Sequence, residues 1–142
     1  MKVQYLPTFI KDLKKLRKQP VYDQILPIYS MDNLTHTLQQ ATIKVLQDYR
    51  DFLGHDPESE LHLVFDEKTH HYILLETGWH KNQRIYGNLI HLQIINGKIW
   101  IQQDGTEAGI AGELLDRGIS HQQIVLAFKT LERRKITDFA VI

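Results

Sequence analysis

The sequence has no cysteine. Disulfides, thiolate metal sites and a thiol nucleophile are therefore excluded, and the composition suits a reducing compartment. The longest apolar runs fall far short of the roughly 20 residues that cross a bilayer, and residues 1–5 lack the apolar stretch of a signal peptide. Glycine-rich phosphate loops and the Gly-x-Ser-x-Gly nucleophile turn are also missing. We therefore expect a soluble cytoplasmic protein.

The net charge is zero, but the charges are unevenly distributed along the chain. Residues 1–30 contain six basic and two acidic side chains, a balance of +4, whereas residues 31–142 contain 11 basic and 15 acidic ones, a balance of −4. Such a boundary indicates two segments with different partners. We interpret residues 1–30 as a basic appendage and residues 31–142 as the main domain, whose acidic balance disfavours binding to a phosphate backbone.

The main domain begins with a helical pattern and continues with strands. An apolar stripe after Asp32 predicts a helix over 33–53, which Gly54 ends. Alternation then predicts a strand over 61–65. Two further strands are predicted over 72–79 and 84–95, and a fourth follows Asn96-Gly97 and ends at 104–105. Asn96-Gly97 predicts a type I′ hairpin turn, because both positions need positive φ. The strands therefore form an antiparallel four-stranded meander.

Two further helices are predicted after the meander. Thr106 is a candidate cap for a helix over 107–117, and Ser120–Gln123 has the capping-box spacing for a second helix that turns Phe128 inward. The basic run 133–135 is interpreted as solvent-exposed, and residues 137–142 as an extended tail. Together these elements predict the α+β class.

The segment before residue 31 has its own pattern. A short strand is predicted over 2–6, followed by an amphipathic helix over 9–18 that Pro20 ends. Phe9, Leu13 and Leu16 share one face of this helix, and four lysines lie away from that face. Residues 1–25 weakly resemble the opening strand and helix of RelE/ParE-superfamily toxins. The sheet that carries the catalytic residues of those toxins does not follow here, so the resemblance implies a fragment without a catalytic residue.

Several short sequence segments along residues 31–142 are distinctive. They include Met31-Asp32-Asn33-Leu34 at the start, Gly78-Trp79, Arg84-Ile85-Tyr86-Gly87, the run over 97–107, and Thr137-Asp138-Phe139-Ala140-Val141. Helix or strand periodicity does not produce strings of this length. The whole segment 31–142 resembles the XisI family, the controlling factor for excision of the fdxN element in cyanobacteria.

The resemblance implies an accessory role beside a separate recombinase and a companion called XisH. It supplies no cofactor and no catalytic residue. We therefore predict a non-enzymatic factor that binds a protein partner of the XisH type and can form a homo-oligomer. A direct DNA-binding excision factor is the alternative, against which the acidic main domain argues. A metal-dependent enzyme is a third interpretation.

Three groups of side chains are candidates for function. Trp79, Arg84, Tyr86 and Trp100 form an aromatic and arginine set on neighbouring predicted strands, which fits a protein interface, base stacking or simple core packing. Asp104 and Glu107 form an acidic turn that fits a divalent metal or an acid/base pair, or else a turn former followed by a helix-start carboxylate. The eight histidines show no His-x-His or His-x-x-x-His spacing, so we predict no metal site.

Overall fold

The computed structural model describes residues 31–142, and of Met31 and Asp32 only the backbone. The predicted strand over 2–6, the predicted helix over 9–18, the RelE/ParE-like fragment and the boundary at 30/31 lie outside the described residues. Helix α3 (Met31–Leu53) begins the described chain and agrees with the predicted helix over 33–53, apart from two residues at its start. It ends as expected at Gly54, which has a φ of 70° and donates its backbone N–H to the Arg50 carbonyl at 3.1 Å.

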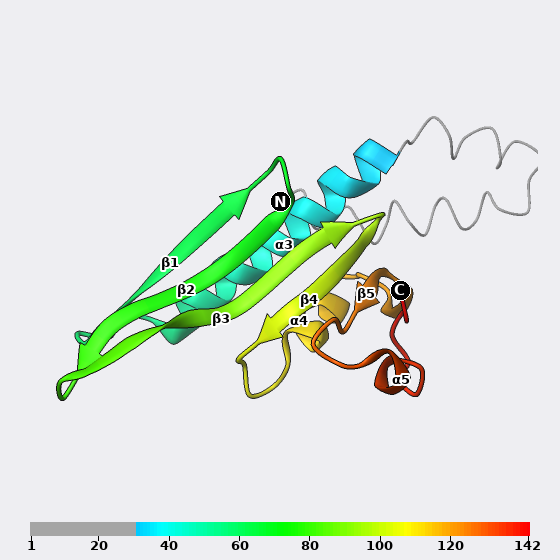
Figure 1. Ribbon diagram of the computed structural model, residues 1–142. Coiled ribbons are helices and arrows are strands. Elements are labelled where there is room, and N and C mark those ends of the chain that lie inside the picture. The colour runs from blue at the N-terminus through cyan, green and yellow to red at the C-terminus, as the bar shows by residue number, and fades with distance from the viewer. Residues whose placement is uncertain (1–30) are drawn as a thin grey trace, which may run out of the picture.

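Four strands follow α3 in the predicted order. They are β1 (Ser59–Asp66), β2 (His71–His80), β3 (Gln83–Ile95) and β4 (Lys98–Asp104). They form the expected antiparallel meander (Figure 1). The turn between β3 and β4 has a φ of 48° at Asn96 and 73° at Gly97, which confirms the positive φ predicted at both positions.

A fifth strand corrects the prediction of a second C-terminal helix. The Ser120 backbone N–H does donate to Gln123 Oε1 at 3.0 Å, as in a capping box, but the element that follows is the three-residue 3₁₀ turn η2 (His121–Gln123). Strand β5 (Ile124–Val125) comes next and pairs in parallel with Ile99 and Trp100 of β4. The free edge of β4 offers backbone hydrogen bonds to two β-branched residues, and this long-range pairing replaces the helix.

The end of the chain folds around β5. Phe128, predicted to point inward, is 49% exposed. Among the described residues that follow β5, the only helix is the short α5 (Leu131–Arg134). The Ala140 backbone N–H donates to the Ile124 carbonyl at 2.9 Å, which ties the predicted extended tail to β5.

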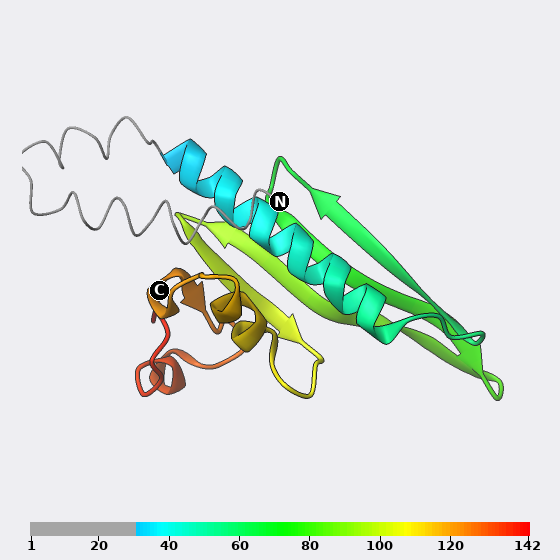
Figure 2. The ribbon, with the colours of Figure 1, turned by 180° about the vertical axis from the view of Figure 1, so that it is seen from behind.

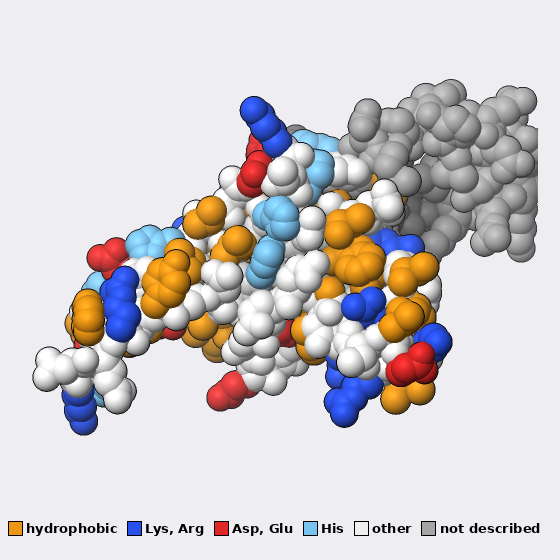
Figure 3. Space-filling view, viewed as in Figure 1, with side chains coloured by type: hydrophobic (Ala, Val, Ile, Leu, Met, Phe, Trp, Pro, Cys, Tyr) orange, Lys and Arg blue, Asp and Glu red, His pale blue; other side chains and the backbone are white. Residues whose placement is uncertain are grey.

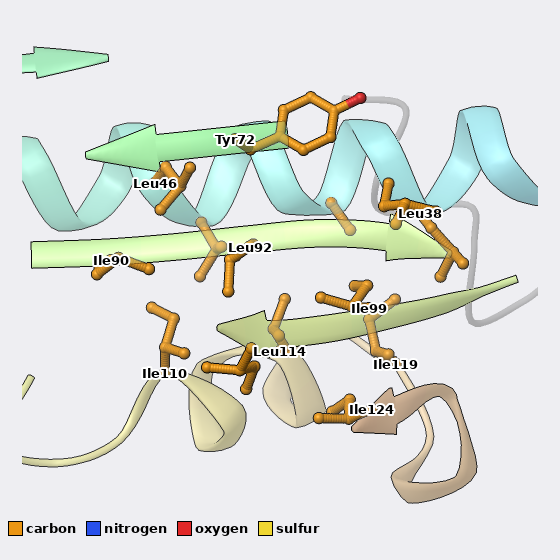
Figure 4. Packing of buried hydrophobic residues seen from close by; sticks show 14 of the residues in the cluster. Leu38, Leu46, Tyr72, Ile90, Leu92, Ile99, Ile110, Leu114, Ile119 and Ile124 are labelled. Carbon is orange, nitrogen blue, oxygen red and sulfur yellow. The ribbon is translucent and has the colours of Figure 1, made fainter. Parts of the chain in front are cut away.

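The core lies between α3 and one face of the sheet, with α4 (Ile110–Asp116) on the same side (Figure 2). Its fully buried members come from α3, β2, β3, β4 and α4, as Figure 4 shows: Leu38, Leu46, Tyr72, Ile90, Leu92, Ile99, Ile110 and Leu114. Within residues 31–142, no element covers the opposite face of β1, β2 and β3 (Figures 1 and 2). The fold thus has one sealed face and one open face.

A bulge in β3 determines which side chains reach the open face. Ile90 and Leu92 point to the core, but the pairing shifts by one residue beside Leu74 and Leu75, where Leu89 is the extra residue. Because successive strand residues alternate between faces, one extra residue reverses the alternation. Arg84 and Tyr86, which share even numbering with the core residues of β3, are therefore exposed on the open face.

Candidate protein-binding surface

Trp79, Arg84 and Tyr86 form one cluster at the hairpin end of the open face, and we call it the aromatic cluster. The Arg84 guanidinium carbon lies 5.5 Å from the Trp79 ring centre and 5.8 Å from the Tyr86 ring centre. Arg84 Nη1 also donates to the Gly78 carbonyl at 3.1 Å, which fixes the guanidinium between the two rings. Trp79 is 60% exposed and Tyr86 is 70% exposed, so neither packs in the core.

The remainder of the open face is apolar and rich in histidine. Val64 is 46% exposed, and Ile73 and Leu75 lie beside it on β2, half-buried. Figure 3 shows hydrophobic and histidine side chains gathered on this face. Exposed aromatic and aliphatic side chains gathered on one face are typical of a protein-binding surface.

Trp100 does not belong to the aromatic cluster. Its place on β4 puts it beside β5, where the Arg134 guanidinium carbon lies 5.6 Å from its ring centre. The structure therefore separates the four predicted interface residues into three that lie together and one that packs under the C-terminal segment.

Arg134 corrects the interpretation of 133–135 as a solvent-exposed run. Its guanidinium donates to four backbone carbonyls, those of Leu126, Ala127, Lys129 and Val141, at 3.0–3.3 Å. Both neighbours of Arg134 are exposed, as predicted, so one residue of the three ties the C-terminal segment together.

The acidic turn has a structural role in the described chain. Asp104 Oδ1 accepts from the Thr106 backbone N–H at 2.9 Å, and Oδ2 accepts from the Ile110 backbone N–H at 2.9 Å. The carboxylate of Asp104, the last residue of β4, therefore lies at the start of α4, which begins three residues later than predicted. Thr106, the predicted cap, instead accepts from the Gly109 backbone N–H at 3.0 Å. Glu107 is exposed in the intervening loop. Across residues 31–142, no group of three histidine or acidic side chains is arranged to hold a metal ion.

The structure pairs two histidines that sequence spacing did not connect. His71 Nδ1 lies 2.8 Å from His91 Nε2 across β2 and β3 on the open face. The register of β2 and β3 explains this contact. His91 pairs with Ile73, two residues from His71, so the two histidines are diagonal neighbours on one face of the sheet. Burial, together with the nearby His71, lowers the pKa of His91 below its ordinary value.

The lowered pKa of His91 predicts a loss of stability in mild acid. The unfolded state takes up a proton as the pH falls through the ordinary histidine value of about 6.5, while the folded state resists it, so unfolding is favoured below that pH. We expect the melting temperature to fall between pH 7.5 and pH 5.5, and to fall less in His91→Gln. His121→Gln, on the far C-terminal segment, should leave the wild-type slope unchanged. A wild-type slope in His91→Gln would contradict the assignment.

No helix within residues 31–142 is long and apolar enough to cross a membrane. The sealed core and the open aromatic face define a small α+β protein that exposes one aromatic surface. The model of the XisI protein family matches residues 31–141, and the chain therefore belongs to the XisI family.

Two crystal structures agree with this assignment. A XisI-like protein from Anabaena variabilis ATCC 29413 is 33% identical, with a TM-score of 0.72, and the match covers 76% of this chain and 99% of that one. The fdxN element excision controlling factor XisI from the same organism is 34% identical, with a TM-score of 0.67, and the match covers 77% of this chain and 98% of that one. No curated protein matches the chain.

Proposed function

We propose that this protein is a non-enzymatic accessory factor, similar to the excision controlling factor XisI, that binds a protein partner of the XisH type. The aromatic cluster on the open face is the observation that carries this proposal. Large exposed rings held around an arginine match the residue types that dominate binding energy at protein interfaces. Membership of a family whose solved relative is described as an excision controlling factor supports a regulatory role.

The surroundings of the cluster favour a protein partner over nucleic acid. Strands β1 and β2 carry no lysine or arginine, and β3 contributes only Arg84. Affinity for a phosphate backbone depends on many such cations. The arginine and the rings would also stack on unpaired bases. Direct DNA binding is therefore the alternative, and the experiment must distinguish it from binding to a protein partner.

The test is co-purification with a XisH-type protein, followed by titration of single variants. Trp79→Ser and Tyr86→Ser should each raise the dissociation constant about 30-fold, the effect of losing an interface hot spot. Because both rings are exposed, the melting temperature should stay within error of wild type. The matched control is Ile136→Ser, which removes another exposed apolar side chain, 86% exposed, from the C-terminal segment and should leave binding unchanged.

Two outcomes would contradict the proposal. One is equal affinity of the wild type and both aromatic variants for the XisH-type protein. The other is micromolar binding of duplex DNA at physiological salt that is lost in Arg84→Gln, which would establish the direct DNA-binding alternative.

A further inference from the structure

A groove of about 620 Å³ lies on the sealed side of the molecule, away from the aromatic cluster. The C-terminal half of α3 forms one wall, and the loop before α4 forms another; Figure 2 shows both on the same side of the sheet. Tyr49, Phe52, Leu89 and Ile110 give the groove an apolar lining. Phe52 is 81% exposed, although its ring centre lies only 6.0 Å from that of Tyr49. An aromatic ring this exposed next to a groove leaves apolar surface for an occupant.

Every charged side chain that lines this groove is acidic. Two of them are already paired, because Arg117 contacts Asp48 at 2.6 Å and Glu113 at 3.0 Å. The other two, Glu76 and Glu107, form no salt bridge with any described residue. The groove therefore presents uncompensated negative charge beside apolar surface. Burial raises the pKa of the Tyr49 phenol, and the nearby carboxylates of Asp104 and Glu107 raise it further, in keeping with a negative local potential.

We infer that this groove is the docking site of the chain's own basic amino-terminal segment. The segment carries a charge of +4 against −4 for residues 31–142. Its sequence places Phe9, Leu13 and Leu16 at helical spacing, with lysines between them. Such a pattern supplies apolar groups for the lining and cations for the two carboxylates.

The connection to α3 is long enough for this docking. Residues 19–30 span up to about 40 Å when extended. Helix α3 runs about 27 Å from Met31 to Tyr49, at 1.5 Å per residue. A tether of this length holds the segment near the groove at an effective concentration on the order of millimolar, so a weak contact suffices for occupancy.

The cysteine-free sequence allows a direct test in the full chain. Leu13→Cys combined with Phe52→Cys should form an intramolecular disulfide under mild oxidation at least tenfold faster than Leu13→Cys combined with Val64→Cys. Val64 is a fair control, because it is 46% exposed but lies on the open face. Adding Glu76→Lys and Glu107→Lys should slow the first reaction at least fivefold. Adding Glu67→Lys and Asp138→Lys, which change exposed acids elsewhere, should not.

Three results would overturn the inference. They are equal rates for the two cysteine pairs, a rate that the groove charges do not affect, and disulfide-linked dimers as the sole product, which would assign the groove to a second copy. A spin label on Leu13→Cys alone provides a measurement that leaves the groove intact. It should broaden the amide signals of residues 105–110 and spare those of residues 62–66. Neither outcome depends on binding of a XisH-type partner, because the aromatic cluster lies on the other face.

Discussion

Replacing Arg134 by methionine should lower the free energy of unfolding by about 2–4 kcal/mol. The substitution leaves four backbone carbonyls without the donors that the guanidinium supplies, and it removes the cation beside the Trp100 ring. Hydrogen bonds from a charged group contribute roughly 1.5–3 kcal/mol each, and part of that loss is recovered as water reaches the exposed side of the segment. Urea unfolding monitored by tryptophan fluorescence measures the change.

Arg133→Met is the matched control for this substitution. Arg133 is exposed, and its side chain forms no hydrogen bond or salt bridge with the described residues. We therefore expect a change within about 0.5 kcal/mol. Equal losses in the two variants would show that the four carbonyls do not depend on Arg134.

Adding a single methyl group at Gly78 should destabilise the protein by about 3 kcal/mol. A Cβ atom at this position would overlap the carbonyl oxygen of Glu58 and would lie 2.8 Å from Cα of Ser59. Both obstacles are backbone atoms of the paired segment, and the Trp79 backbone N–H donates to the same Glu58 carbonyl at 3.1 Å. Relief of the overlap therefore requires the start of β1 to separate from β2, a costly form of overpacking.

Gly87→Ala tests whether the effect belongs to the position and not to loss of glycine. Gly87 lies on β3 opposite Glu76, close to Gly78 along the sheet, and a Cβ atom there would meet nothing within 4 Å. Thermal melts should show Gly87→Ala near wild type and Gly78→Ala clearly lower. Similar melting temperatures would mean that the strands accommodate the methyl group.

Local patterns were sufficient to predict the elements that depend mainly on neighbouring residues. The stripe that follows Asp32 and the glycine at 54 define α3, because helix faces and caps are set within a few residues. Asn96-Gly97 defines the hairpin between β3 and β4 for the same reason. The resemblance to the XisI family also rested on contiguous strings, and the family match confirms it.

Tertiary contacts decided the elements for which local signals competed. The capping-box residues Ser120 and Gln123 form their hydrogen bond, yet the chain enters β5 because the edge of β4 lies beside it. Asp104 was one of two acidic residues with several possible roles, and its contacts with Thr106 and Ile110 give it a structural one. The pairing of β5 depends on a strand far away in the sequence, whereas the contacts of Asp104 are local and fit only one of the roles that its spacing left open.

The candidate protein-binding surface likewise depends partly on local sequence and partly on tertiary structure. Sequence alone determined that Trp79, Arg84 and Tyr86 would occur on neighbouring strands. Only the bulge at Leu89 placed Arg84 and Tyr86 on the open face, since strict alternation from Ile90 would have turned both toward the core. Strand register likewise paired His71 with His91. Which face of the sheet a side chain takes depends on the register of its strand and on any bulge in that strand. One extra residue reverses the alternation of all residues beyond it, so composition and spacing could not predict the face.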